Sequence, residues 1–152
     1  MENIHILEMK SEHIDDVQKL IGQLNELFST DHDISMDAIK KTVLNMIQFK
    51  DIYLNFVAME GNKIVGFIST IFYKTFFHPG GTVLINELII DKAFRGKGIG
   101  MRLISKIKEM AKQRRMNEIE VGTTFNNKKA INFYKKAGLT DEGLLLGEEL
   151  KP

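Results

Sequence analysis

The sequence contains no cysteine, only two prolines and no long apolar run. The absence of cysteine excludes disulfides, cysteine nucleophiles and thiolate metal sites. A membrane-spanning helix needs about 20 consecutive apolar residues, and no stretch of this chain approaches that length. The first ten residues, MENIHILEMK, lack a basic segment followed by an apolar one, so we expect no signal peptide. These absences favour a cytoplasmic location and no membrane partner.

The overall amino-acid composition is that of an ordinary globular domain. The chain has 152 residues, of which 43% are hydrophobic and 27% charged. This length is enough to bury a hydrophobic core without disulfide cross-links. We find no internal repeat, low-complexity tract or linker, and therefore expect a single domain over residues 1–152.

Apolar periodicity predicts the element order β-α-α-β-β-β-α-β-α-β. The expected helices are 11–28, 35–49, 99–114 and 128–137, and the expected strands are 3–9, 51–60, 63–77, 82–91, 117–124 and 144–150. Ser35 is suited to begin the second helix, Asn126 or Asn127 the fourth, and Gly138 to end it.

Chain connections define the expected sheet. The helix at 99–114 joins two strands and suits a right-handed parallel crossover, whereas the earlier strands are joined as hairpins. We therefore expect an α/β (α+β layered) fold: a mixed, mostly antiparallel central sheet with one parallel βαβ pair and helices on both faces. The last strand, LLLGEEL, could complete this sheet or contact a second copy.

Positive charge is concentrated between Lys92 and Arg115. This segment holds nine Lys or Arg and one acid, a local charge of +8 in a chain whose net charge is +1. Such a strip favours a locally bound anionic partner. The alternative is a solvated helix face that serves solubility.

The sequence FRGKGIG at 94–100 lies between a predicted strand and a predicted helix. The first N–H groups of a helix lack intrahelical partners and favour an anion, and glycine allows close backbone approach. Arg95 and Lys97 add positive charge. The Walker pattern is absent, and the Rossmann pattern fails because Leu103 stands at the third glycine position. A tight turn without a ligand is the alternative.

Two motifs together resemble the GNAT superfamily of N-acetyltransferases. LIIDKAFRGKGIGMRLI at 88–104 is similar to the family's acyl-CoA signature, with its Arg-x-x-Gly-x-Gly loop. NKKAINFYKKAGL at 127–139 matches the second signature at Asn127, Ala130, Tyr134 and Gly138. Leu139 stands where phenylalanine is usual. The predicted order of elements also resembles the family fold over most of the chain.

The resemblance implies acetyl-CoA as cosubstrate, an amine as acceptor, direct transfer and no metal. It implies a bulge in the strand before the loop and a strand after the helix that splays away from it. It places the pyrophosphate on the backbone N–H groups of the loop and the pantetheine arm in that gap along the preceding strand, where a backbone N–H would polarise the thioester carbonyl. The implied cofactor-binding residues are Leu88, Ile89, Ile90, Arg95, Gly96, Lys97, Gly98, Ile99, Gly100, Asn127 and Tyr134.

Two residues are the candidates for proton transfer. Tyr134 matches the family's general acid, which would protonate the departing thiolate; the alternative is an aromatic residue that packs on the sheet. Glu87 lies in the strand before the loop, where many family members place a carboxylate, and would act as the base directly or through water. An edge position facing solvent would weaken that role. Asn127 is a helix cap, a CoA contact or both.

The acceptor and the partners are less constrained. The connection between the first two helices carries Asp31, Asp33 and Asp37, which favours a cationic small molecule, while FYKTFF at 72–77 would favour an aromatic amine. His32, within the sequence TDHD, is more consistent with a solvated loop than with a metal site. No nucleic-acid motif is present. A catalytically silent acyl-CoA sensor is the alternative to an enzyme, and a homodimer is a further expectation from the family.

Overall fold

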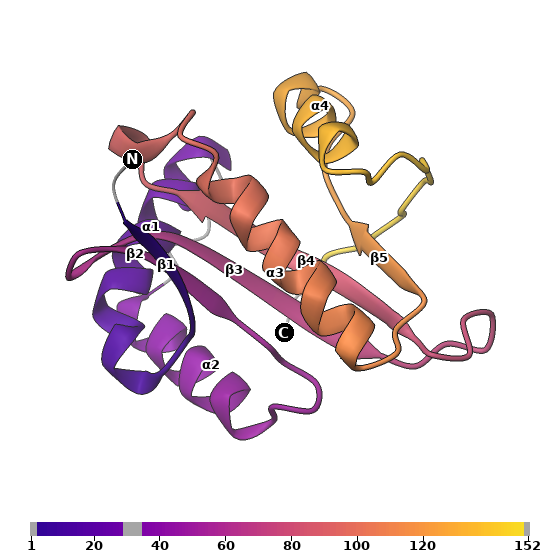
Figure 1. Cartoon of the computed structure of the whole chain (residues 1–152), viewed down its shortest axis with the longest axis horizontal. Coiled ribbons are helices and arrows are strands. Elements are labelled where there is room, and N and C mark those ends of the chain that lie inside the picture. Colours follow the sequence, from indigo (N-terminus) through magenta and orange to yellow (C-terminus); the bar gives the residue numbers. More distant parts are fainter. Residues whose placement is uncertain (1–2, 29–34, 151–152) are drawn as a thin grey trace.

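The computed structural model describes residues 3–28 and 35–150, which form four α-helices and a five-stranded sheet (Figure 1). The strands are β1 (Ile4–Glu8), β2 (Phe56–Glu60), β3 (Lys63–Tyr73), β4 (Thr82–Ile90) and β5 (Glu118–Val121). The helices are α1 (Ile14–Phe28), α2 (Met36–Gln48), α3 (Ile99–Gln113) and α4 (Lys128–Lys136), with short 3-10 helices at Ser11–His13 and Lys92–Phe94.

The sheet has the order β1-β2-β3-β4-β5, so strands that follow one another in sequence lie side by side. The first three pairs are antiparallel, and β4 pairs with β5 in parallel. The helix between β4 and β5 makes this parallel pairing feasible, because it returns the chain to the starting end of the sheet. The predicted mixed sheet with one βαβ unit is confirmed.

Helices cover both faces of the sheet. On one face α3 buries Ile99, Leu103 and Ile107 against a core cluster that includes Ile68, Val83 and Ile85. On the other face α1 and α2 pack over Val57, Phe67 and Ile89, burying Val17, Leu20, Ile39 and Val43. Strand β3 lies between the two layers and is almost entirely buried, as expected for a continuous apolar run. None of the helices in the described residues is long and apolar enough to cross a membrane.

Local signals set most helix ends. Ser35 Oγ accepts the N–H of Ala38 at 3.1 Å and Asn127 Oδ1 accepts that of Ala130 at 3.1 Å, so both predicted caps are confirmed. Gly138 has a φ of 88°, and the N–H of Leu139 bonds the carbonyl of Tyr134 at 3.0 Å. This is the Schellman ending that glycine favours.

The predicted strand at 144–150 is wrong. No strand or helix forms between Thr140 and Leu150, and the leucines of this segment are 68–86% exposed. Three consecutive leucines followed by glycine and two acids do not alternate between faces. The segment therefore has no single apolar side with which to join the sheet, and β5 remains an edge strand.

Strand β4 contains one irregularity, at Asn86. Ser69 pairs with Glu87 while Thr70 pairs with Ile85, so Asn86 is an extra residue and forms a β-bulge. Strand β5 pairs only with Thr82–Ile85. Beyond the bulge, no described strand pairs with β4 on that side, and the two strands of the parallel pair separate.

Candidate functional site

The loop between β4 and α3 is shaped by two glycines in left-handed backbone conformations. Gly96 has a φ of 79° and Gly98, the N-cap of α3, a φ of 78°. A Cβ added at either position would meet no atom within 4 Å. Both are therefore required by backbone geometry, and the loop that they shape forms a cradle at the first N–H groups of α3, which lack intrahelical partners. The start of a helix beside such a glycine loop favours an anion.

Gly100 has a different reason to be glycine. A Cβ there would lie 3.0 Å from Cζ of Phe133, so the ring of α4 rests directly on the first turn of α3. This contact places α4 beside the N-terminal end of α3 (Figure 1). The three glycines of the motif thus divide into two that shape the loop and one that admits a neighbour.

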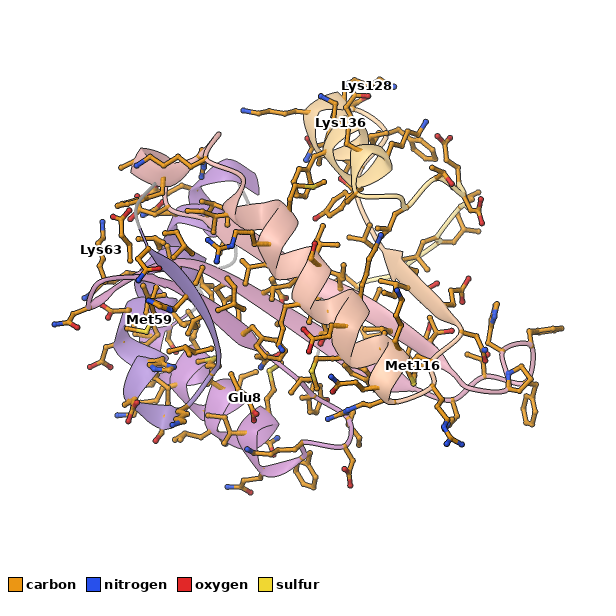
Figure 2. The ribbon with its side chains drawn as sticks, viewed as in Figure 1. Glu8, Met59, Lys63, Met116, Lys128 and Lys136 are labelled. Atoms are coloured by element: carbon orange, nitrogen blue, oxygen red, sulfur yellow. The ribbon has the colours of Figure 1, made fainter. Side chains whose placement is uncertain are left out.

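The loop is fixed to the end of β4 by its own side chains. Asp91 accepts the N–H of Ala93 at 2.9 Å, and Arg95 Nε donates to the carbonyl of Ile90 at 3.0 Å. The bond from Ala93 is the main reason that the pKa of Asp91 is lowered, with Lys63 contributing at 3.2 Å. Figure 2 shows Lys63 at one end of the sheet and Met116 at the other.

The aromatic ring of Phe94 supports two cations beside the cradle. Lys63 Nζ and Lys97 Nζ lie 4.8 Å and 4.7 Å from its centroid. These distances are within the range of cation–π attraction. Positive charge beside the cradle therefore comes from the loop, through Lys97, and from the start of β3, through Lys63.

The basic strip of residues 92–115 is not one continuous anion-binding surface. Besides Arg95 and Lys97, five of its nine cations make contacts within the protein. Lys92 pairs with Glu26 at 2.7 Å, Arg102 donates to the carbonyl of Ile4, Lys106 to Glu109, Lys108 to the carbonyl of Ala137, and Arg114 to the carbonyls of Lys50 and Asp51. The strip's cations at the cradle are Arg95 and Lys97, so charge in the strip mostly secures α3 to its neighbours.

The open edge of β4 presents backbone groups next to the cradle. The N–H of Asp91 bonds the carbonyl of Val65 at 2.9 Å. Hydrogen-bonded pairs alternate along an antiparallel ladder, so Ile89 also directs its N–H toward β3. The N–H groups of Leu88 and Ile90 therefore face the gap between β4 and β5. This is an edge along which an extended amide-containing chain can be bound.

Glu87 is half-buried and lies on the α1/α2 face of the sheet. It is directly opposite Ser69, whose Oγ donates a hydrogen bond to Glu87 Oε2. The next residue on the same face, Ile89, is 3% exposed. The carboxylate is thus half-buried and bonded to Ser69, although no described strand pairs with β4 on its other side at this position.

Tyr134 lies on α4, on the side of the sheet that α3 covers. Its ring packs against the core cluster beneath α3 and meets Phe133 edge-on at 5.2 Å between centroids. Burial raises its pKa above the ordinary value of 10.0. The phenol therefore stays protonated at neutral pH. Asn127 caps the same helix and is half-buried.

The two candidate proton-transfer groups lie on opposite sides of β4, with no direct contact. Of the three acids expected near the acceptor, Asp37 is exposed at the start of α2, and Asp31 and Asp33 lie outside the described residues, as does His32. In the described ranges 3–28 and 35–150, no group of three His, Asp or Glu is placed to hold a metal.

The FYKTFF segment does not form an aromatic pocket at this site. Phe76 and Phe77 are fully exposed in the β3–β4 loop. Phe72 and Tyr73 line a shallow surface groove with Met116 and Arg114, at the far end of α3 from the glycine loop.

The resemblance implies a bulge in β4 but does not place it at Asn86, and sequence reasoning missed two features of the site: the partner Ser69 and the close contact of Phe133 with Gly100. The bulge leaves a signal in the apolar pattern. Val83 and Ile85 are in phase with each other but out of phase with Leu88 and Ile90, although all four contact the same core. Ser69 has no such signal, because its meeting with Glu87 depends on the strand register.

Comparisons with known proteins agree with this architecture. Residues 20–139 match the family described as Acetyltransferase (GNAT) family. A thialysine N-epsilon-acetyltransferase of Mus musculus is 25% identical over 149 residues, which cover 93% of this chain and 86% of the mouse protein. An uncharacterized N-acetyltransferase of Methanocaldococcus jannaschii is 41% identical over 63 residues, which span 41% of this chain and only 28% of that protein.

Solved structures show the same fold. An aminoglycoside N-acetyltransferase in complex with CoA superposes with a TM-score of 0.85 at 17% identity, covering 100% of this chain and 97% of that one. The glucosamine-6-phosphate N-acetyltransferase of Arabidopsis thaliana gives a TM-score of 0.81 at 19% identity, covering 99% and 100%. The chain belongs to the GNAT acetyltransferase family, and this membership supports acetyl transfer to an amine.

Proposed function

We propose that this chain transfers an acetyl group from acetyl-CoA to a primary amine by direct attack. The observation that carries the proposal is the cradle of Gly96 and Gly98 at the start of α3, adjoining an unpaired edge of β4. Acetyl-CoA would supply an acetyl group activated as a thioester. The protein then has to bind and orient this cosubstrate, accept a proton from the acceptor ammonium and donate a proton to the departing thiolate.

Binding is assigned to two stretches of backbone. The N–H groups of the loop 95–100 hold the pyrophosphate, with Arg95 and Lys97 as counter-charges. The N–H groups of Leu88 and Ile90 hold the pantetheine arm, and one of them polarises the thioester carbonyl. Ile89 lies between them with its side chain in the core, and Asn127 contributes a CoA contact in addition to its cap.

Proton transfer is assigned to Glu87 and Tyr134. An alkylammonium has a pKa near 10.4 and must lose a proton before it attacks, and the Glu87 carboxylate accepts that proton. Tyr134 donates a proton to the departing thiolate. Burial raises its pKa, so the phenol carries its proton at neutral pH and is available as a donor, although transfer to a thiolate whose conjugate thiol has a pKa of about 8.5 is uphill.

The acceptor is proposed to be a cationic small molecule. The acids that support this proposal are the half-buried carboxylate of Glu87 and the exposed carboxylate of Asp37, although Lys40 and Lys41 lie one turn from Asp37 on α2. Similarity to enzymes named for thialysine and for aminoglycosides supports an amine of this kind. A panel of polyamines, aminoglycosides, thialysine and neutral amino acids separates the classes, and turnover of neutral amino acids alone would contradict a cationic acceptor.

The test combines thiol release with direct binding. We expect acetyl-CoA binding by calorimetry and amine-dependent release of CoA thiol. Tyr134→Phe should lower kcat by about 100-fold, within the usual range for a general acid, and leave acetyl-CoA affinity unchanged. An unchanged kcat would refute the acid assignment. Tight acetyl-CoA binding without thiol release for any amine would favour the alternative, a catalytically silent acyl-CoA sensor.

We also propose that the chain forms a homodimer through its C-terminal segment. Leu144, Leu145, Leu146 and Leu150 are 68–86% exposed, beside the edge strand β5. Exposed apolar residues in such a cluster are typical of interaction surfaces. Light scattering after gel filtration should give twice the chain mass, and removal of residues 142–152 should give a monomer. A monomeric full-length chain would contradict this proposal.

A further inference from the structure

The β-bulge at Asn86 determines the face on which Glu87 lies. Val83 and Ile85 contact the core beneath α3, and so do Leu88 and Ile90. In a regular strand Glu87 would share the face of Ile85, because side chains alternate with a period of two. The extra residue shifts the phase by one. It turns Glu87 away from the α3 core and toward the α1/α2 face.

On that face Glu87 meets a single hydroxyl. Ser69 is 2% exposed, and it lies directly across the ladder from Glu87. Its Oγ donates to Glu87 Oε2. One pair further along the same face, Phe67 and Ile89 are 2% and 3% exposed and are directly opposite each other. The hydroxyl and the carboxylate therefore meet beside a tightly packed apolar pair, where neither can rotate freely.

We propose that Ser69 is a positioning residue for the acetyl-transfer reaction. Its hydroxyl holds Oε2 of Glu87 and leaves Oε1 directed to the acceptor ammonium. In the step that this prepares, an N–H bond of the ammonium breaks, an O–H bond forms on Glu87, and the nitrogen keeps the electron pair with which it attacks. This inference rests on the proposed function, in which Glu87 is the base.

Two observations favour positioning over a purely structural role. A serine with its hydroxyl in an apolar layer is unfavourable unless it is bonded, and an alanine would fill this site without any polar group. The hydroxyl of Ser69 bonds the carboxylate of Glu87, and the proposed reaction requires that carboxylate to be oriented. Among the residues that the structure describes, no second hydrogen bond to the Glu87 carboxylate is found, so Ser69 is its sole orienting contact.

The chain contains a matched control. Thr82 is also on the sheet, is fully buried, and donates from Oγ1 to Glu118 Oε2 at 2.8 Å. Glu118 lies on β5 and at the far end of β4 from the glycine loop. Thr82→Val therefore removes an equivalent buried hydroxyl–carboxylate bond without touching the proposed site.

The experiment compares Ser69→Ala, Glu87→Gln, the double variant and Thr82→Val, with acetyl-CoA and thialysine or the best acceptor of the panel. We expect Ser69→Ala to lower kcat about tenfold with little change in KM for acetyl-CoA, and to cause no further loss in the Glu87→Gln background. Ser69→Thr should recover much of the loss. Thr82→Val should lower the melting temperature and leave kcat unchanged.

A spectroscopic measurement tests the contact without turnover. In protein labelled with carboxyl-¹³C glutamate, Ser69→Ala should shift the Glu87 resonance, which Glu87→Gln identifies, and Thr82→Val should shift only that of Glu118. An unmoved Glu87 resonance, or losses of kcat that multiply in the double variant, would overturn the positioning role. Full activity of Glu87→Gln would instead overturn the base assignment of the proposed function, and Ser69 with it.

Discussion

Replacing Gly98 or Gly100 by alanine should produce two different defects, although the residues are two positions apart. At Gly98 the new Cβ has open space, but the backbone has a φ of 78°. At Gly100 the backbone is helical, and the new Cβ would lie 3.0 Å from Cζ and 3.4 Å from Cε2 of Phe133. The first substitution strains the loop, and the second displaces the ring.

The magnitudes differ between these two situations. A non-glycine residue held in the left-handed region costs roughly 1–2 kcal/mol, which the loop can relieve by opening. We therefore expect Gly98→Ala to weaken acetyl-CoA binding about tenfold with kcat nearly unchanged. At Gly100, overpacking costs roughly 1–3 kcal/mol, and the helix propensity of alanine offsets about 1 kcal/mol of that.

The defect at Gly100 should appear in catalysis. Phe133 contacts Tyr134 edge-on at 5.2 Å, so a ring moved by a few tenths of an ångström carries the phenol with it. A misplacement of about 1 Å costs about 100-fold in rate, and we expect Gly100→Ala to lower kcat by about three- to tenfold. Its affinity for acetyl-CoA should change less than that of Gly98→Ala.

Calorimetry with CoA and steady-state kinetics distinguish the two effects. Phe133→Leu, introduced into the Gly100→Ala background, removes the close contact and should restore part of the kcat. If both alanine variants only weaken CoA binding, or if Phe133→Leu restores no activity, then the contact with Phe133 is not the reason that residue 100 is a glycine. The division of the motif into loop-shaping and packing glycines would then be wrong.

Three further predictions concern stability. Asn127→Ala should lower the free energy of unfolding by about 1 kcal/mol through loss of the α4 cap, and Asn127→Asp should retain most of it; chemical denaturation measures both. Gly138→Ala should cost about 1 kcal/mol in the same assay, because its φ of 88° strains any other residue. The hydrogen bond from Tyr73 to Glu120, assisted by burial, raises the pKa of Tyr73 to about 12. A raised folded-state pKa means that this stabilisation is complete below pH about 10, where the unfolded phenol titrates, and is lost as the pH rises toward 12. Melting curves at pH 8 and 11 should therefore show a smaller alkaline loss for Tyr73→Phe than for the unmodified chain.

Much of the fold could be predicted because its signals are local. The apolar stripe of α3, the caps Ser35 and Asn127 and the ending at Gly138 each depend on a few neighbouring residues. The glycine loop was also predictable, because the glycines that indicate positive φ lie directly before the residues whose apolar pattern indicates the start of a helix. The predicted strand at 144–150 failed because a strand needs a partner edge, which no local pattern supplies.

The chemistry of the site was harder to predict where it depends on register. The pairing of Ser69 with Glu87 requires both the β3–β4 alignment and the extra residue at Asn86. The apolar phase change indicates that an irregularity exists in β4, but does not say which residue is extra. Charge counting also overstated the basic strip, because contacts such as that of Arg102 with the carbonyl of Ile4 appear only in three dimensions.

The short pairing of β4 with β5 has a consequence for how the molecule opens. Four residue pairs join β5 to the rest of the sheet, and of the residues from Gly122 to Leu150 only Ala137 is buried. Such a unit can detach without melting the layers around β3. Amide hydrogens of β5 and α4 should therefore exchange with solvent orders of magnitude faster than those of β3. A ligand bound between β4 and β5 would slow this exchange, because its binding would be coupled to closure of β5 and α4 onto the sheet.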